Sequence, residues 1–246
     1  IQAAEESALH SCDNIFYPLH AENQWIYQLN FDGETSSQTA FTVSEVAESS
    51  VILAALDYDT GIITQSTVGC SNGEIINFPV TELNMVLGYL DGQIDIQHVS
   101  GVYMPSETAF TDANWQLEWE TEYMANGQLS ATVEGETFSA TLSSSPVQME
   151  WQVINTGGSV SVPAGNFENV VQIERKLEID VTELQAVFQG QNVNVSTTLT
   201  LITNMYFAPG VGLLKQDFES AEVRFFGVNF PLEATGSLEL TSYQVN

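Results

Sequence analysis

Basic residues are almost absent from this chain of 246 residues. Lysine and arginine together number 4, against 32 aspartate and glutamate residues, so the formal net charge at pH 7 is −28. The charged fraction is only 15%, below the quarter or so found in an average protein. A field of this sign repels polyanions. The composition therefore excludes nucleic acids and anionic membrane surfaces as partners that bind through charge.

The chain also lacks a run of about 18 apolar residues, the length a membrane-spanning helix requires. It does not begin with a basic segment followed by an apolar one, so we expect any export signal to precede these residues. Serine, threonine, asparagine and glutamine take the polar positions that lysine usually shares. This composition predicts an extracytoplasmic protein, either secreted, at the cell surface or periplasmic.

Cysteine is nearly absent as well, with only Cys12 and Cys70. Neither belongs to a C-x-x-C or cysteine/histidine cluster of the kind that binds metal. In an exported chain two cysteines usually pair, and we predict a disulfide between them. The letters "LHSC" before Cys12 end like a lipoprotein cleavage box, but they follow "AAEES" and not an apolar segment. Cys12 is therefore not expected to be a lipid anchor.

Apolar and polar residues alternate through most of the chain. The pattern is clear in "WIYQLNF" (25–31), "WQLEWETEY" (115–123), "VQMEWQV" (147–153) and residues 171–181. A period of two is typical of antiparallel strands with one face on a core and the other in water. The chain is predicted to be all-β, forming a large curled antiparallel sheet, a β-sandwich or a half-barrel. At most two short helices are expected, at residues 4–10 and 81–90.

Pairs of residues that end in glycine mark most of the predicted turns. Hairpin turns are expected at Asp32-Gly33, Asp91-Gly92, Asn126-Gly127 and Gly157-Gly158, with further turns at Asn72-Gly73 and Gly190.

A short pattern in the first part of the chain recurs in the second. An aromatic residue, a proline, a polar spacer and a tryptophan follow one another in "FYPLHAENQW" and again in "VYMPSETAFTDANW". We therefore predict one β domain over residues 1–246, with two related halves at about 1–100 and 101–246.

The stretch "YFAPGVGLLKQDF" (206–218) looks at first like a phosphate-binding glycine loop. A P-loop requires G-x-x-x-x-G-K-[ST] before a helix, whereas Lys215 is followed by Gln216 and then by a strand-like segment. A dinucleotide loop fails too, because Lys215 stands where the last glycine belongs. We interpret Pro209, Gly210 and Gly212 as a turn between two strands.

Two motifs resemble those of a loose family of exported bacterial β-rich proteins, most of them without an assigned function. One is "VPAGNF", whose turn residues are Pro163 and Gly165, and the other is "APGVGLLK" about 40 residues later. The family's opening, a cysteine shortly before Tyr-Pro-Leu and a tryptophan strand, is similar to the start of this chain. The resemblance implies a long sheet curled over a core, distantly like the periplasmic lipoprotein carriers. It implies no catalytic residues.

The alternating acids Glu118, Glu120 and Glu122 are the strongest candidates for an enzyme. They resemble the acidic strand of laminarinase-like glycosidases, where the outer carboxylates lie about 6.5 to 7 Å apart along the strand. Here the middle residue is glutamate in place of aspartate, and Trp115 and Trp119 are expected to point the opposite way. We interpret the three acids as a solvated face over an aromatic core.

The segment "DYDTG" (57–61) begins like a calcium loop, which makes Asp57 and Asp59 candidates for a weak calcium site. An EF-hand requires a glutamate at its twelfth position, and Val68 stands there instead. A hairpin turn explains the segment better. His10, His20 and His98 show no paired metal spacing, and no cofactor is expected.

Two classes of function follow from these observations. The first is a non-enzymatic exported protein that binds an apolar small molecule in a curled sheet, or that serves as an accessory or structural subunit for a protein partner at the cell surface. The second is a carbohydrate-active protein, a glycoside hydrolase or glycan-binding module, that uses the acidic strand face. The first is preferred, because the aromatic side chains are predicted to face a core and not a cleft beside the acids.

Overall fold

A computed structural model describes residues 11–31, 34–77, 91–133, 136–188, 191–225, 228–232 and 236–246. The two predicted helices and the predicted turns at Asp32-Gly33 and Gly190 lie outside the described residues. The described part is all-β with one short helix, as the alternating pattern predicts.

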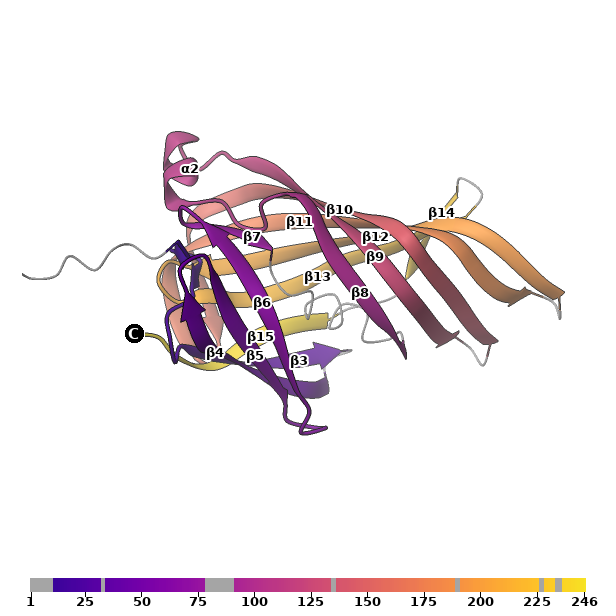
Figure 1. The fold of residues 1–246 in the computed structure, drawn as a ribbon, viewed down its shortest axis with the longest axis horizontal. Coiled ribbons are helices and arrows are strands. Elements are labelled where there is room, and N and C mark those ends of the chain that lie inside the picture. Colours follow the sequence, from indigo (N-terminus) through magenta and orange to yellow (C-terminus); the bar gives the residue numbers. More distant parts are fainter. Residues whose placement is uncertain are drawn as a thin grey trace, which may run out of the picture.

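Thirteen strands form one antiparallel sheet (Figure 1). Its order is β7-β6-β5-β4-β3-β15-β13-β12-β11-β10-β9-β8, and β14 pairs with β13 off this path. The strands are β3 (Gln24–Phe31), β4 (Glu34–Ala47), β5 (Ser50–Asp57), β6 (Ile63–Ser71), β7 (Glu74–Asn77), β8 (Asp91–Gly101), β9 (Glu118–Val133), β10 (Glu136–Val162), β11 (Gly165–Phe188), β12 (Gln191–Ala208), β13 (Gly212–Phe225), β14 (Val228–Leu232) and β15 (Gly236–Gln244). Because β15 pairs with β3, the beginning and the end of the chain share this sheet.

The sheet curls until its two edges meet at one point, which makes it a nearly closed, barrel-like structure. The edge strands are β7 and β8, and the segment after β8 returns to β7. Backbone hydrogen bonds join Ile75 to Met104 in both directions, at 2.9 and 3.1 Å. A curled single sheet, and not a sandwich of two sheets, is therefore the architecture.

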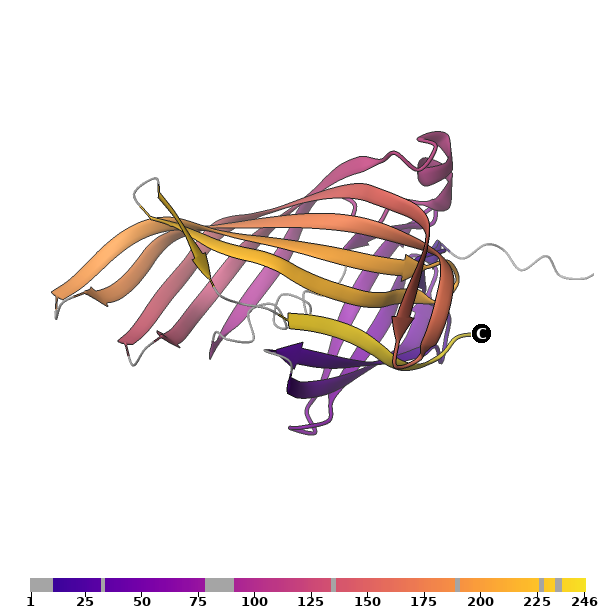
Figure 2. The same cartoon turned by 180° about the vertical axis from the view of Figure 1, so that it is seen from behind.

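The two ends of the curled sheet differ (Figures 1 and 2). One end carries the two-stranded hairpin of β1 (Asp13–Asn14) and β2 (Tyr17–Pro18), the helix α2 (Glu107–Asp112) and the carboxyl terminus. We call it the covered end. At the opposite end the β9–β10 and β11–β12 hairpins reach well beyond the amino-terminal strands.

Alternation gives the sheet an interior face and an outer face. In β11 the side chains of Ile173, Leu177 and Ile179 are at most 1% exposed, while Glu174 and Glu178, which alternate with them, remain in contact with water. The same alternation runs through the neighbouring β10, where Val147, Met149 and Trp151 are buried. Burial of this interior face supplies most of the stabilisation of the fold.

Three predicted hairpin turns are wrong. Asp91-Gly92 lies in β8, where the two residues pair with Ser130 and Leu129 of β9. Asn126-Gly127 lies inside β9 and Gly157-Gly158 inside β10, each beside a register shift in the strand pairing. At Asn126-Gly127, the backbone N–H of Ser144 donates to the Asn126 side chain at 2.8 Å. Glycine at positive φ serves a β-bulge as well as a tight turn. The local sequence therefore does not distinguish a bulge within a strand from a hairpin turn. Asn72-Gly73 does join β6 to β7, with φ values of +52° and +79°.

The strand predicted from Trp115 begins three residues later, at Glu118. Trp115 instead follows helix α2 with φ +61°, and its ring stacks on Phe110 at a centroid distance of 5.6 Å. The helix was not predicted. Ser106 caps it by accepting a hydrogen bond from the backbone N–H of Ala109, which is the usual role of serine at this position.

Candidate functional site

The segment from Ser11 to Leu19 closes one end of the curled sheet. Cys12 is joined to Cys70 of β6 by a disulfide. Buried Asn14 donates to the backbone carbonyls of Gly73 and Pro105 at 2.7 and 2.9 Å, and accepts from the backbone N–H of Phe16 at 2.9 Å. A disulfide and a buried, fully used amide therefore fix this segment against the rim of the sheet.

The proline–glycine turn between β12 and β13 supports the same segment. The backbone N–H of Gly210 donates to the carbonyl of Ile15 at 2.7 Å. A Cβ at Gly212 would lie 3.4 Å from Trp25 Nε1 and 3.5 Å from the Phe16 carbonyl oxygen. The turn interpretation of Pro209, Gly210 and Gly212 agrees with this geometry, and the turn's neighbours are protein groups.

The other glycine motif is also a turn. Pro163 and Ala164 connect β10 to β11, and Val162 pairs with Gly165 across the connection. The backbone N–H of Ala164 donates to the Leu240 carbonyl at 3.0 Å. This turn therefore lies against β15, at the covered end.

Aromatic rings fill the interior below the closing segment. Phe16 lies 5.2 Å from Phe110 and 5.5 Å from Phe207 between ring centroids. Tyr17 packs edge-on against Tyr103 at 5.7 Å, and the two hydroxyls are 3.3 Å apart. These rings come from four parts of the chain, so the closing segment is part of the core and not a loose cover.

Beside these rings the interior holds an apolar cavity of about 40 Å³. The polar atoms of its wall are already used, because Trp25 Nε1 donates to the Val211 carbonyl at 2.6 Å and the Tyr27 hydroxyl to the Leu213 carbonyl at 2.8 Å. The lining residues are Phe16, Tyr17, Pro18, Leu19, Trp25, Tyr27, Phe41, Leu53, Gly212, Leu213 and Leu238. Such a wall is mostly apolar and suits a hydrocarbon group.

A row of larger side chains crosses the interior face on three neighbouring strands. Trp119, Trp151 and Arg175 are opposite one another on β9, β10 and β11. The two indole rings stack at 5.6 Å with an angle of 4°, and the guanidinium of Arg175 lies 5.4 Å from the centre of the Trp151 ring. Attraction between a cation and an aromatic face favours this arrangement.

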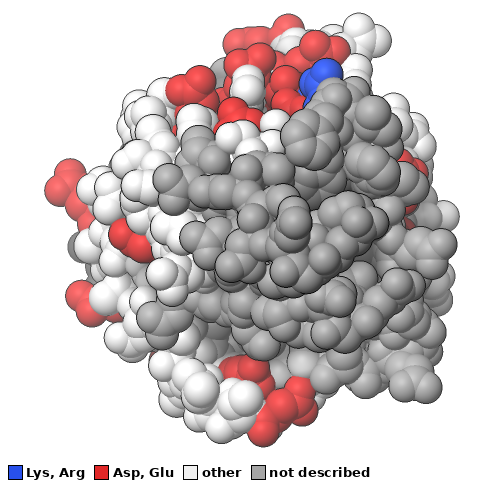
Figure 3. All heavy atoms as spheres, turned by 90° about the vertical axis from the view of Figure 1, so that its right-hand side faces the viewer, with Lys and Arg blue, Asp and Glu red and all other residues white. Residues whose placement is uncertain are grey.

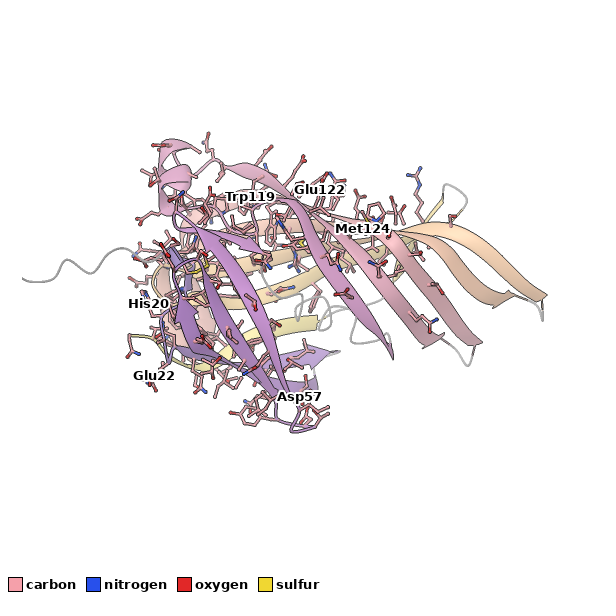
Figure 4. The ribbon with its side chains drawn as sticks, in the orientation of Figure 1. His20, Glu22, Asp57, Trp119, Glu122 and Met124 are labelled. Carbon is pink, nitrogen blue, oxygen red and sulfur yellow. A yellow bond between two sulfur atoms is a disulfide. The ribbon has the colours of Figure 1, made fainter. Side chains whose placement is uncertain are left out.

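The predicted catalytic acids lie on the outer face. Glu118, Glu120 and Glu122 are exposed; Glu118 accepts from Gln152 at 2.9 Å and Glu122 from Ser100 at 2.7 Å. Figure 4 shows Glu122 and Trp119 on β9. Since residues of one strand alternate between faces, the indole of Trp119 lies across the sheet from the three carboxylates.

Two lysines are held among carboxylates on this outer face. Lys176 lies 3.2 Å from Glu178, and Lys215 lies 3.1 Å from Asp217. Burial alone would lower the pKa of Lys215, but the nearby carboxylates outweigh it and hold that pKa above its ordinary value. Seen from the end opposite the covered one, acidic side chains are spread over the described surface, with a basic one near the top (Figure 3).

The outer face also carries a polar hollow of about 260 Å³. Two of its carboxylates accept hydrogen bonds from threonines, Asp180 from Thr198 at 2.8 Å and Glu178 from Thr200 at 3.4 Å. Its lining residues are Pro146, Gln148, Glu178, Asp180, Thr198, Thr200, Glu222 and Arg224. Its wall is polar, in contrast to that of the interior cavity.

The candidate calcium ligands occupy a hairpin tip between β5 and β6, far from the covered end (Figure 4). The carboxylate of Asp57 accepts from the backbone N–H groups of Asp59 and Thr60, at 2.8 and 3.0 Å. Asp57 thus shapes the turn itself. Within the described ranges, no three histidine, cysteine or acidic side chains are gathered so that they could hold a metal ion.

Sequence reasoning missed three residues of the interior. Asn14 and Tyr103 carry no local signal, because their partners are distant along the chain. Arg175 does carry one: it occupies the apolar phase of β11, between Ile173 and Leu177. A charged residue at an apolar position of an alternating strand is the feature that could have identified it.

The described helix is too short and too polar to cross a membrane.

The fold resembles that of a provisionally assigned lipoprotein from Parabacteroides distasonis, with a TM-score of 0.56 and 16% identity over 94% of this chain and 99% of the other. It also resembles a provisionally assigned exported protein with a YmcC-like fold from Bacteroides fragilis, with a TM-score of 0.52, 13% identity and the same coverage. These identities show the fold alone. No protein-family model and no curated protein matches the chain.

Proposed function

We propose that this chain is an exported, non-enzymatic protein that holds an apolar ligand inside its curled sheet. The observation that carries the proposal is the cavity at the covered end, whose polar wall atoms are satisfied by the protein itself. An empty apolar space costs the fold dispersion contacts, and an apolar ligand restores them without a desolvation penalty.

The size of the cavity favours a linear ligand. Sites for compact small molecules usually have volumes of about 300–1,000 Å³, whereas this one measures about 40 Å³. The space fits the end of a hydrocarbon chain. We therefore propose an acyl or alkyl chain whose terminal carbons enter between Tyr27, Phe41 and Leu238.

Binding and export are consistent with the rest of the molecule. The Cys12–Cys70 disulfide suits an oxidising compartment. The acids that favoured a glycosidase lie on the opposite face from the aromatic rings, so they support solubility in this account and not catalysis. The acidic outer face would be available to a protein partner at the cell surface.

A fluorescent probe tests the proposal. We expect N-phenyl-1-naphthylamine to brighten on binding the protein and to be displaced by a C12 hydrocarbon ligand. Replacing Leu53 with phenylalanine adds ring atoms to the cavity wall, and we expect it to weaken probe binding about tenfold or more, because a blocked site removes the burial of apolar ring surface at about 25 cal/mol per Å². Fluorescence titration measures both effects.

Leu56→Phe is the matched control. Leu56 lies on the same strand, three residues away and on the outer face, where it is half-buried. It should leave probe binding unchanged. Equal binding by all three proteins, or no displaceable probe in the parent, would refute an interior site.

A further inference from the structure

Exposed apolar side chains gather at the tip of the β5–β6 hairpin. Tyr58, Ile62 and Ile63 are 48%, 58% and 65% exposed. In the part of the chain that the structure describes, the other exposed large apolar side chains lie singly on β8, β10 and β15. Isolated apolar residues on a surface are ordinary, whereas a group of them marks an interaction site.

The protein holds this tip, which is labelled at Asp57 in Figure 4, in one shape. The Asp57 carboxylate accepts from the backbone N–H groups of Asp59 and Thr60. The Asp57 backbone N–H donates to the Ile62 carbonyl at 3.0 Å, and the Gly61 N–H donates to the Asp57 carbonyl at 2.8 Å. These bonds fix the turn while the apolar side chains beside it stay in water. A preformed surface loses little conformational entropy when a partner binds it.

The strand that leads into the tip, β5, is apolar on both faces, unlike β11, whose outer face is charged. Its inner side chains are buried, and Leu53 among them lines the cavity. Its outer side chains are half-buried and also apolar: Ile52, Ala54 and Leu56. Strands with apolar residues on both faces are usually covered by protein on both. On β5 the outer side chains still contact water, so that cover is incomplete within the described residues.

This apolar surface extends across four strands. Leu56 of β5 pairs with Ile63 of β6 on one side and with Ala40 of β4 on the other. Ala40 pairs in turn with Ile26 of β3. Directly paired residues project from the same face of a sheet, so these four form one row on the outer face, and the row ends at the tip. We call the row and the tip the apolar patch: Ile26, Ala40, Leu56, Tyr58, Ile62 and Ile63.

The charges around the apolar patch are all of one sign. Residues 1–174 contain no lysine or arginine, so the charged groups of strands β3 to β7 are carboxylates. Asp59 is at the tip, and Glu45 pairs with Ile52 of β5. Two copies of this chain that met through the patch would bring like charges together, which opposes association. An anionic lipid surface is disfavoured for the same reason, whereas a basic partner is attracted.

From this arrangement we propose that the apolar patch is a docking surface for a protein partner that presents an apolar pocket edged by lysine and arginine. The apolar side chains form the centre of the contact, with Asp59 and Glu45 on its rim, as in other protein interfaces. Tyrosine is among the residues that contribute most to such contacts, and Tyr58 is at the tip. The inference goes beyond the proposed function, because the cavity is on the other face of the sheet.

A designed peptide tests the apolar part of this surface. The probe is a fluorescent amphipathic helix of about 18 residues with leucine on one face and lysine on the other, and fluorescence anisotropy measures its binding. We expect Ile62→Ser and Ile63→Ser each to weaken binding about tenfold, because burial of one isoleucine side chain favours association on that scale. Ile154→Ser replaces an isoleucine of β10 that is 46% exposed. It is the matched control and should leave binding unchanged.

A charge reversal tests the acidic rim. Asp59→Lys should weaken binding of the leucine–lysine peptide several-fold and strengthen binding of a leucine–glutamate peptide of the same pattern. Glu107→Lys makes the same change in net charge on helix α2 at the covered end, and it should leave both affinities unchanged. Circular dichroism checks that each variant is folded, which we expect because such surface substitutions rarely alter stability.

Other occupants of the apolar patch give different outcomes. A dimer in sedimentation velocity that Ile63→Ser abolishes would identify a second copy of this chain, and phosphatidylcholine vesicles bound by the parent but not by Ile63→Ser would identify a lipid surface. Either result contradicts the inference. So does a leucine–lysine peptide that does not bind the parent, or that binds Ile63→Ser and Ile154→Ser equally. Ile63→Ser should leave N-phenyl-1-naphthylamine binding in the cavity unchanged, so this inference and the proposed function fail separately.

Discussion

Replacing Gly101 with alanine is expected to lower the melting temperature by about 6–12 °C. Gly101 ends β8 with φ +81°, and a Cβ there would clash with the backbone carbonyl oxygen of Glu120. The clash involves backbone on both sides, so strands β8 and β9 must move apart. Overpacking and strain at positive φ together cost about 3 kcal/mol, and each kcal/mol shifts the melting temperature by about 2–4 °C in a chain of this size.

Gly157→Ala is the control for this variant. Gly157 has almost the same backbone angle, φ +75°, but a Cβ there would meet nothing within 4 Å. We expect it to cost about 1 kcal/mol, from the angle alone. Differential scanning calorimetry of the two variants isolates the close approach of Gly101 to β9, and equal melting temperatures would show that this approach does not constrain the fold.

Removing the disulfide is expected to have an effect of similar size. The Cys12–Cys70 bond spans 58 residues, and closing a loop of that length contributes about 4 kcal/mol in the chain-entropy account. The double variant Cys12→Ala/Cys70→Ala should therefore melt about 8–16 °C below the parent. It should also lose probe binding before it loses the sheet, because the disulfide fixes the segment that forms one wall of the cavity.

Chemical reduction of the parent is the companion measurement. Dithiothreitol should lower the parent's melting temperature by a similar amount and leave the double variant unchanged. Intact mass after alkylation without reductant should show no modified thiol in the native protein. Two alkylated cysteines under those conditions would contradict the disulfide.

The alternating strands and the two turn motifs were predictable because their signals are local. The exposure of Glu118, Glu120 and Glu122 follows from a period of two, and the turn at Pro209-Gly210 from the backbone preferences of proline and glycine. The hairpin turn predicted at Asn126-Gly127 was wrong because that prediction also used only local signals. A bulge and a hairpin turn both use glycine at positive φ, and the strand pairing that separates them is set by residues far along the chain.

The candidate site was less predictable, because it is assembled from distant segments. The curl closes where Ile75 meets Met104, and the cavity forms where Phe16 and Leu19 return to β3, β4 and β13. None of these contacts leaves a pattern within a window of ten residues. Arg175 was the exception, since its place in an apolar phase is readable from β11 alone, while its partner Trp151 comes from a different strand.

The central claim is that a hydrocarbon chain lies inside the curled sheet, and nuclear Overhauser contacts from a bound ligand test it most directly. Dodecanoate labelled with ¹³C at its terminal methyl group would be added to the parent protein. We predict contacts from that methyl to the rings of Tyr27 and Phe41, which line the cavity. Contacts to Tyr58 instead, which is 48% exposed on the β5–β6 hairpin, would show that hydrocarbon binds the outside of the protein and would contradict the account.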